Sequence, residues 1–118
     1  MTYDKNNIFA KILRGEIPCK KIYEDEYVLA FEDISPAAPV HVLVIPKEAF
    51  ISLHDFSQAA SDKTMKGFFS GIEKTAEKLG LEKNGYRVIS NHGKDGGQIV
   101  PHFHVHILGG RQLGKLVV

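Results

Sequence analysis

The sequence predicts an α+β domain built on a five-stranded antiparallel sheet with one long and one short helix, and three observations support this fold class. Apolar periodicity gives the order helix, three strands, long helix, two strands, which favours an antiparallel sheet over a parallel sheet with alternating helices. No internal repeat, low-complexity tract or linker divides the 118 residues, so residues 1–118 are predicted to form a single domain. A chain of this length buries roughly two-thirds of its unfolded surface, which is enough for a core without disulfides.

The N-terminal part is predicted to form a short helix followed by a β-hairpin. Apolar residues recur at helical spacing over residues 8–13, with Asn6 or Asn7 as a possible N-cap and Gly15 just past the end. Residues 19–24 and 27–31 are rich in Ile, Tyr, Val and Phe and are separated by two acidic residues, which is typical of a hairpin.

A loop and a buried strand are predicted next. Residues 33–39 contain two prolines, which lack a backbone donor and disfavour both a helix and a central strand. Val40–Ile45 is almost wholly apolar and β-branched, as expected of a strand that is buried on both faces. The polar exception in this strand is His41, which has two possible roles: a functional imidazole or a hydrogen-bonded core histidine.

The long helix is predicted over Ser57–Leu79, because apolar residues repeat there at helical spacing and Gly80 follows as a residue suited to the position after a helix. Gly67 and Gly71 lie four positions apart on this helix. In a chain without a membrane segment, this spacing favours close packing of the helix against a sheet. Two further strands are predicted over Tyr86–Asn91 and Ile99–Leu108, joined by a glycine-rich turn.

Composition excludes several classes of partner. The chain has 15 Lys and Arg against 14 Asp and Glu, interspersed to a formal charge of +1, so we expect no nucleic-acid binding. No apolar run approaches the ~20 residues of a membrane helix, and residues 1–8 do not resemble a secretory signal, so we expect a cytoplasmic protein with no membrane association. Cys19, the lone cysteine, cannot form an internal disulfide or supply a zinc ribbon and fits a reducing compartment.

The segment with the clearest chemical signal contains three alternating histidines. If residues 99–108 form a strand, His102, His104 and His106 share one face, about 7 Å apart, while Phe103, Val105 and Ile107 point into the core. Three interpretations follow. The imidazoles hold zinc with His41 as a further ligand, the central imidazole is a nucleophile that attacks phosphorus, or all three are surface histidines on an exposed strand.

The neighbourhood of the three histidines favours a phosphate site over a metal site. No Asp or Glu lies within three residues of them to act as an additional ligand. The preceding Gly96-Gly97 pair offers backbone N–H groups that could hold an anion, or it is simply a hairpin turn. We therefore expect no metal and no cofactor.

The run HFHVHIL at residues 102–108 resembles the His-φ-His-φ-His-φ-φ signature of the histidine triad (HIT) superfamily. Further segments resemble its Hint branch of histidine triad nucleotide-binding proteins, namely IFAKILRGEIP, AFEDISPAAPVHVLVIPK, and DGGQ leading into HFHVHILGGRQ. The resemblance covers nearly all of residues 8–112, and the separation between these segments makes it specific. It implies a HIT-like fold and a homodimer in which the sheet extends across both subunits.

The resemblance also implies an activity and residue roles. Hint-branch proteins bind purine nucleotides and hydrolyse nucleoside 5′-phosphoramidates to an amine and a nucleoside monophosphate through a covalent nucleotidyl-histidine. Carried over, His104 is the nucleophile, His102 and His41 are imidazoles that fix its tautomer, and His106 contacts the phosphate or the leaving group. Alternatively, the same nucleophile serves a dinucleoside polyphosphate hydrolase, or the protein binds nucleotides with only residual catalysis.

The resemblance assigns nucleotide contacts as well. Asp33 matches the ribose-binding carboxylate, although sequence alone equally allows an Asx turn before Pro36. Asn91 and the backbone of Gly97 and Ile99 match phosphate contacts. The purine pocket corresponds to apolar positions that the bare sequence would place in an ordinary core: Ile8, Phe9, Ile12, Phe31, Ile34 and Leu43.

Two departures from the family pattern affect these expectations. Many Hint-branch members carry a serine where this chain has Ile99, and isoleucine offers only its backbone N–H. The chain ends in GKLVV where family members often have a Trp-containing tail. For the dimer, the adjacent Phe68 and Phe69 add modest support. Two neighbouring aromatics cannot both face the centre of one narrow stripe, so the helix has either an interface or a wide buried face.

Overall fold

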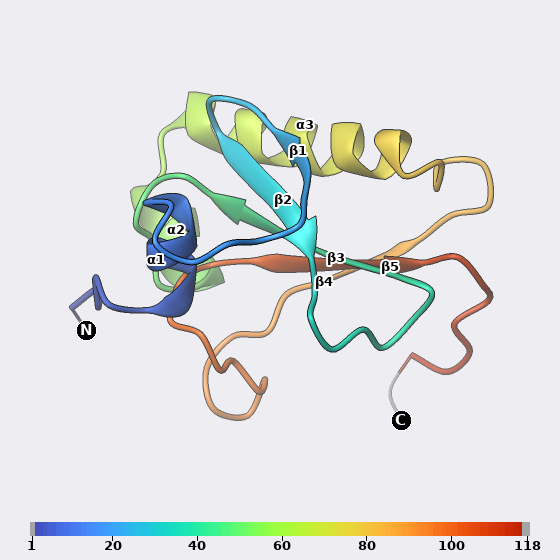
Figure 1. The fold of residues 1–118 in the computed structure, drawn as a ribbon. Coiled ribbons are helices and arrows are strands. Elements are labelled where there is room, and N and C mark those ends of the chain that lie inside the picture. The colour runs from blue at the N-terminus through green and yellow to red at the C-terminus, as the bar shows by residue number, and fades with distance from the viewer. Residues whose placement is uncertain (1, 117–118) are drawn as a thin grey trace.

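The protein was analysed as a computed structural model that describes residues 2–116, so Met1 and residues 117–118 of the predicted domain lie outside the description. Within the described residues the chain forms a five-stranded antiparallel sheet in the order β1-β2-β3-β5-β4, with three helices (Figure 1). The predicted fold class is confirmed. The elements are α1 (Ile8–Leu13), β1 (Lys21–Glu24), β2 (Val28–Glu32), β3 (Val40–Pro46), α2 (Leu53–Ala59), α3 (Asp62–Lys78), β4 (Arg87–Ile89) and β5 (Val105–Gly109).

The first predicted elements are confirmed. Helix α1 begins after Asn7, whose side chain accepts a hydrogen bond from the Ala10 N–H at 2.9 Å and so satisfies one of the free donors of the first turn. Strands β1 and β2 pair antiparallel as the predicted hairpin, with a register shift between Lys21 and Tyr23. Strand β3 matches the predicted strand over residues 40–45 and extends to Pro46.

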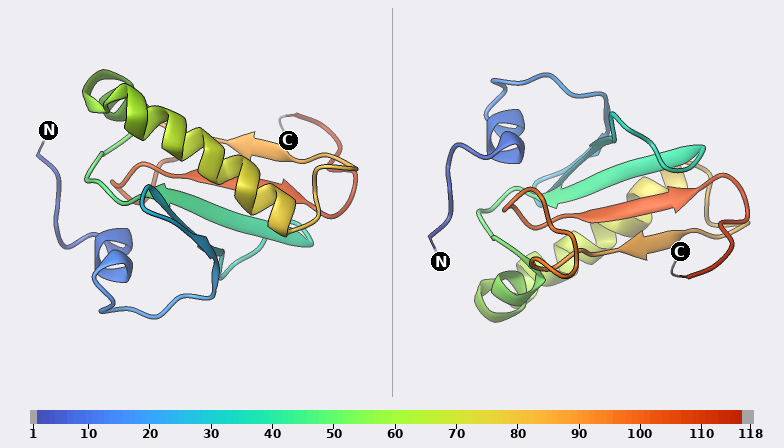
Figure 2. Two further views of the ribbon diagram at one scale, coloured as in Figure 1. Left: turned by 90° about the horizontal axis from the view of Figure 1, so that it is seen from above. Right: turned by 90° about the horizontal axis from the view of Figure 1, so that it is seen from below.

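Side chains of β2 and β3 are buried on both faces of the sheet, which explains their continuous apolar runs. Val28 and Val44 face the core beneath α3, which lies across one face of the sheet (Figure 2). Leu29 and Leu43 belong to a second cluster on the opposite face, together with Phe9 of α1. In the described part of the chain, no helix is both long and apolar enough to cross a membrane.

The predicted helix over Ser57–Leu79 is wrong in its bounds, because the chain forms two helices there, α2 and α3. Ala60 is extended, and the Ser61 side chain caps α3 by accepting from the Thr64 N–H at 3.0 Å. Helix α2 begins earlier than predicted, after Ser52, whose side chain caps its first turn. The apolar periodicity continues across the break, since both helices pack on the same core.

The predicted strand over Ile99–Leu108 is also wrong in its bounds, because β5 begins only at Val105. Pro101 has no N–H to donate to a neighbouring strand. The amide of Gln98 instead bonds the carbonyls of Ile51 and Val100, at 2.6 and 3.1 Å, and holds the chain in a loop. Strand β4 is likewise shorter than the predicted Tyr86–Asn91.

Gly67 and Gly71 pack against the sheet as predicted, and Gly71→Ala is expected to destabilise the protein. A Cβ at Gly71 would lie 2.6 Å from Val28 Cγ2, and the Val28 side chain is fully buried and cannot move aside. Overpacking of this kind costs about 1–3 kcal/mol, which offsets the ~1 kcal/mol that alanine gains over glycine in a helix. Denaturant unfolding of Gly71→Ala beside Ser70→Ala, an exposed position on the same helix, measures the difference. Equal or higher stability of Gly71→Ala would contradict the packing argument.

Candidate active site

The three alternating histidines have different environments. His102 is fully buried, His104 is 7% exposed, and His106 is half-buried in β5. The three imidazoles share one face as predicted, since Phe9 packs against both His102 and His104, and the ring of His104 lies 5.3 Å from that of His106. Of the three, His104 and His106 line a cavity, whereas His102 does not. The companion prediction is confirmed, since the apolar residues between and after the histidines belong to the main core: Phe103, Val105 and Ile107.

The hydrogen bond of His104 determines which ring nitrogen carries its proton. Nδ1 lies 2.8 Å from the backbone carbonyl oxygen of His102. A carbonyl only accepts, so Nδ1 carries the hydrogen and, in the neutral ring, Nε2 keeps its lone pair. Burial lowers the pKa of His104, which favours this neutral form. Phe9 packs edge-on against the ring at 5.0 Å and restricts its rotation. His104 therefore presents an unprotonated nitrogen.

The His102 ring is also fixed in one tautomer. Its Nε2 lies 2.9 Å from the Pro46 carbonyl oxygen and donates to it, so Nδ1 accepts from the Tyr3 hydroxyl at 2.5 Å. Burial lowers the pKa of His102 to about 4. The structure thus differs from the expectation for His102, because its backbone carbonyl and not its imidazole bonds His104. The sequence analysis missed Tyr3 and Pro46, since nothing local in the sequence indicates these partners.

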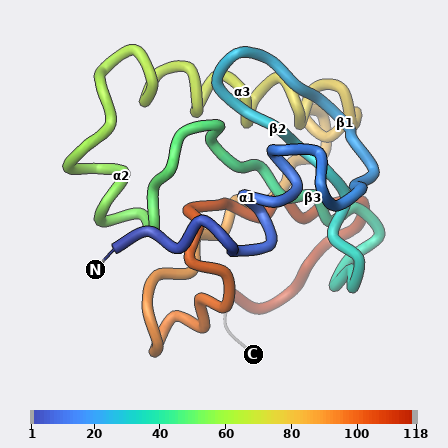
Figure 3. Tube along the Cα trace, turned by 60° about the vertical axis from the view of Figure 1, so that its left-hand side comes forward, coloured from blue at the N-terminus to red at the C-terminus, as the bar shows by residue number. Residues whose placement is uncertain are grey.

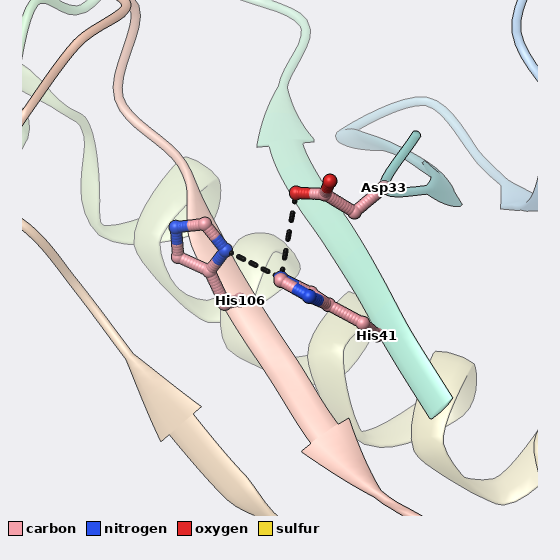
Figure 4. Close-up of side chains that lie close together, drawn as sticks. All are labelled: Asp33, His41 and His106. Atoms are coloured by element: carbon pink, nitrogen blue, oxygen red, sulfur yellow. Dashed lines mark hydrogen bonds and ion pairs between the residues drawn. The ribbon is translucent and has the colours of Figure 1, made fainter. Parts of the chain in front are cut away.

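His41 and His106 form a second hydrogen-bonded pair, on neighbouring strands β3 and β5 (Figure 4). The Ala37 N–H donates to His41 Nδ1 at 2.9 Å, so His41 Nε2 carries the hydrogen. This Nε2 lies 2.9 Å from His106 Nδ1 and 3.4 Å from Asp33 Oδ2. His106 Nδ1 therefore accepts, and its Nε2 carries a hydrogen. His41 contacts His106 and not His104, contrary to the role that the resemblance implied for it.

The Asp33 carboxylate forms the turn that the sequence allowed and also lies at the cavity. Its Oδ1 accepts from the Ser35 N–H at 2.7 Å, which is the Asx turn that the sequence allowed. Its Oδ2 faces His41, and the side chain also lines the cavity beside His104 and His106. The turn therefore holds the carboxylate in place through Oδ1, and Oδ2 does not take part in the turn.

A cavity of about 920 Å³ brings together most of the predicted site. His41 and His102 do not line it, but His41 bonds His106 and the His102 carbonyl bonds His104, both of which do. Phe9, Phe31 and Leu43 are buried as the core interpretation expected, whereas Ile34 is 95% and Ile99 91% exposed at the cavity. The predicted residues that line it are Ile8, Phe9, Ile12, Phe31, Asp33, Ile34, Leu43, Asn91, Gly97, Ile99, His104 and His106.

The glycine-rich segment at the cavity forms a hydrogen-bonded turn. The Gly97 N–H donates to the Lys94 carbonyl at 3.1 Å, so this N–H is engaged and does not point freely at a phosphate as expected. The Asn91 amide donates to the Gly96 carbonyl at 2.6 Å. Gln98, which the sequence analysis passed over, bonds the Gly93 N–H at 3.1 Å through its side-chain oxygen. These bonds fix the shape of the cavity wall.

One group of side chains in the described residues could hold a metal ion, namely Asp33, His41 and His106, whose ligand atoms lie within 4.8 Å of one another. The zinc interpretation of the three alternating histidines differs from this grouping, because His102 and His104 are outside it. The hydrogen bonds of Asp33, His41 and His106 account for their positions without an ion. Metal analysis of the purified protein tests the expectation of no metal.

The buried histidines predict that the protein loses stability on acidification. Burial lowers the pKa of His102 and of His106 to about 4 in the fold, and in His106 the charges of His104 and His41 add to the effect. In the unfolded chain these groups titrate near pH ~6.5. Below that pH the unfolded state binds more protons than the native state, so the free energy of unfolding falls as pH decreases. Denaturant unfolding from about pH 7 to pH 5 measures it, and a flat profile would contradict it.

Comparisons with known proteins identify the family. The HIT domain model matches residues 14–113. The chain belongs to the HIT domain family. The purine nucleoside phosphoramidase of Escherichia coli is 42% identical over 113 residues, which is 96% of this chain and 94% of that protein. A HIT histidine triad protein from Clostridium difficile is 45% identical, with a TM-score of 0.84 over 97% of this chain and 98% of the other. A HIT family hydrolase from Clostridium thermocellum is 40% identical, with a TM-score of 0.85 over 98% and 99%.

Proposed function

We propose that this HIT protein hydrolyses the P–N bond of purine nucleoside 5′-phosphoramidates, with His104 as the nucleophile. The observation that carries the proposal is the 2.8 Å bond from His104 Nδ1 to the His102 carbonyl, which leaves the Nε2 lone pair available at a cavity of nucleotide size. The phosphoramidase and hydrolase names of the relatives from E. coli and C. thermocellum support the same chemistry.

The proposed reaction has two displacement steps at phosphorus. In the first, the lone pair of His104 Nε2 forms an N–P bond while the bond from phosphorus to the amine breaks, and the amine nitrogen takes a proton from solvent. The carbonyl of His102 stabilises the positive charge that develops on the imidazole. In the second, water attacks phosphorus, the Nε2–P bond breaks, and water loses a proton. The products are the amine, the nucleoside monophosphate and free His104.

His106 is proposed to donate a hydrogen bond to the reacting phosphoryl group or to the leaving nitrogen. Its Nδ1 accepts from His41 at 2.9 Å, which leaves Nε2–H as the donor at the cavity. A fixed donor aimed at developing charge lowers the barrier without reorganisation. The low pKa of His106, about 4 through burial, keeps the ring neutral, so its interaction with the phosphate is a neutral hydrogen bond.

The nucleoside is proposed to lie between apolar walls with its ribose at Asp33. Phe9, Phe31 and Leu43 offer a dry surface for a flat base and few polar groups to distinguish one purine from another. A carboxylate can accept hydrogen bonds from both ribose hydroxyls. The Asx turn holds Asp33 in position to do so before substrate arrives.

The decisive test is the release of AMP from adenosine 5′-phosphoramidate by the wild-type protein. Hydrolysis of this compound at a higher kcat/KM than a diadenosine polyphosphate supports the phosphoramidase. The opposite order supports the dinucleoside polyphosphate hydrolase, which uses the same nucleophile with a nucleotide leaving group. Absence of turnover with either substrate would contradict both enzymatic proposals.

A nucleotide-binding protein with residual catalysis is the second candidate, and Ile99 favours it. This side chain is 91% exposed at the cavity and carries no hydroxyl to donate to a phosphate or a leaving group. Such a protein would bind AMP measurably and hydrolyse both substrates at a negligible rate. Ile99→Ser would then raise the activity.

A homodimer is proposed as the assembled form. Strand β4 lies at an edge of the sheet, and its Val88 and Ile89 are 45% and 38% exposed. Phe68 is fully buried whereas Phe69 is 60% exposed, so the two aromatics do not form one wide buried face. An exposed sheet edge beside apolar side chains is suited to pairing with a second chain. Light scattering in solution tests the assembly, and a monomeric mass would contradict it.

A cytoplasmic location and a lack of nucleic-acid binding complete the proposal. The lone Cys19 has no partner for an internal disulfide, which fits a reducing compartment such as the cytoplasm. Burial raises the pKa of its thiol and so favours the protonated form, which is less easily oxidised. The 15 basic and 14 acidic residues nearly balance, so we expect no overall electrostatic attraction to the phosphates of a nucleic acid.

A further inference from the structure

We propose that Tyr3 is a positioning residue for His104, acting through His102. The inference rests on the proposed function only for its kinetic consequence, because the geometry on which it stands involves no substrate. The segment before α1 lies beside the segment that leads into β5 (Figure 3). There the Tyr3 hydroxyl and His102 Nδ1, 99 positions apart in sequence, are separated by 2.5 Å.

The direction of this hydrogen bond is fixed. His102 Nε2 lies 2.9 Å from the Pro46 carbonyl, which can only accept, so the hydrogen of the neutral ring is on Nε2. Nδ1 is then an acceptor, and the hydroxyl of Tyr3 is its donor. Among the described residues, no buried side-chain nitrogen or oxygen lacks a hydrogen-bond partner, and Tyr3 supplies the partner for this nitrogen.

The two bonds of the His102 ring also locate the backbone of His102. The ring is fully buried and is held at both nitrogens, by Pro46 from β3 and by Tyr3. The carbonyl of the same residue accepts from His104 Nδ1 at 2.8 Å and thereby determines which nitrogen of His104 is unprotonated. Because the buried ring is anchored at both nitrogens, it restrains the Cα to which it is attached, and so limits movement of the neighbouring carbonyl. Tyr3 is therefore two steps from the proposed nucleophile.

The segment that carries Tyr3 is itself organised before α1. The Asn7 side chain is 6% exposed and caps α1, while its amide donates to the Asp4 carbonyl at 2.7 Å. The Asp4 carboxylate accepts from the Asn6 N–H at 2.8 Å. These bonds shape a turn next to Tyr3, so the hydroxyl is presented by ordered backbone and little conformational entropy is lost in forming its bond to His102.

Tyr3→Phe is the test, because it removes the donor and keeps the aromatic contact with His102. Tyr23→Phe is the matched control. It also deletes a tyrosine hydroxyl, which donates to the Asp25 carboxylate at 2.8 Å, and neither residue lines the cavity. We expect Tyr3→Phe to lower kcat for adenosine 5′-phosphoramidate by about ten- to a hundredfold. KM and AMP affinity are expected to stay within about twofold, because the walls of the cavity are unchanged. Tyr23→Phe is expected to leave kcat unaltered.

Nitrogen-15 NMR of the imidazoles supplies a readout that does not depend on turnover. In the wild type, Nδ1 of His104 and Nε2 of His102 should carry the protons, whereas in Tyr3→Phe the His104 signals should shift toward a mixture of tautomers. Unchanged His104 signals would overturn the inference even if the wild-type protein has no phosphoramidase activity. An equal loss of kcat in Tyr23→Phe, or a change in KM alone, would overturn it as well.

Discussion

Replacing His104 by alanine is expected to lower the rate of phosphoramidate hydrolysis by about 10⁴-fold or more. In the proposed reaction no other group can form the covalent bond to phosphorus, because His106 uses Nδ1 for His41 and carries a hydrogen on Nε2. His102 does not line the cavity and is bonded at both ring nitrogens. AMP affinity should change by only a few-fold, since the apolar walls and Asp33 remain.

His54→Ala is the matched control for this prediction, because it removes an exposed histidine of α2 that does not line the cavity. Intact-protein mass spectrometry at neutral pH should detect a nucleotidyl adduct on the wild type and on His54→Ala during turnover, and none on His104→Ala. Turnover by His104→Ala within tenfold of the wild-type rate would rule out the nucleophilic role of His104.

Local sequence patterns predicted the elements whose hydrogen bonds are local. The hairpin of β1 and β2 follows from two β-rich runs separated by a turn, and α1 follows from its cap at Asn7 and its apolar spacing. The missed break between α2 and α3 was also encoded locally, in the capping of Thr64 by Ser61, but the continuing apolar periodicity concealed it. A cap signal should therefore take precedence over periodicity when both occur.

The sequence predicted which residues gather at the candidate site, but it did not predict which hydrogen bonds join them. The resemblance placed the residues around one cavity, because positions that bind the same ligand must converge in the fold. Which nitrogen bonds which partner depends on contacts between distant segments, such as Tyr3 with His102 and Pro46 with His102. Strand β5 begins only at Val105, so strand pairing could not indicate the partners of the His102 ring, although alternation gave its face correctly. Tautomers follow from these contacts, and no sequence pattern contains them.

His106→Ala is expected to lower kcat by about a hundred- to a thousandfold, because it removes the hydrogen-bond donor proposed to face the phosphoryl group or the leaving nitrogen. His106→Gln should recover part of this loss, since its amide restores a donor.

The hydrogen bond between His41 and His106 predicts that their substitutions are not additive. Of the three alternating histidines, His41 bonds His106, with 2.9 Å between His41 Nε2 and His106 Nδ1, whereas His104 bonds the carbonyl of His102. His41→Ala should therefore lower kcat in the wild-type background but have almost no further effect in His106→Ala, which is the non-additivity expected of residues that act as a unit. Steady-state kinetics of the single and double variants measures this coupling. Additive losses would mean that His41 acts by a route other than its hydrogen bond to His106.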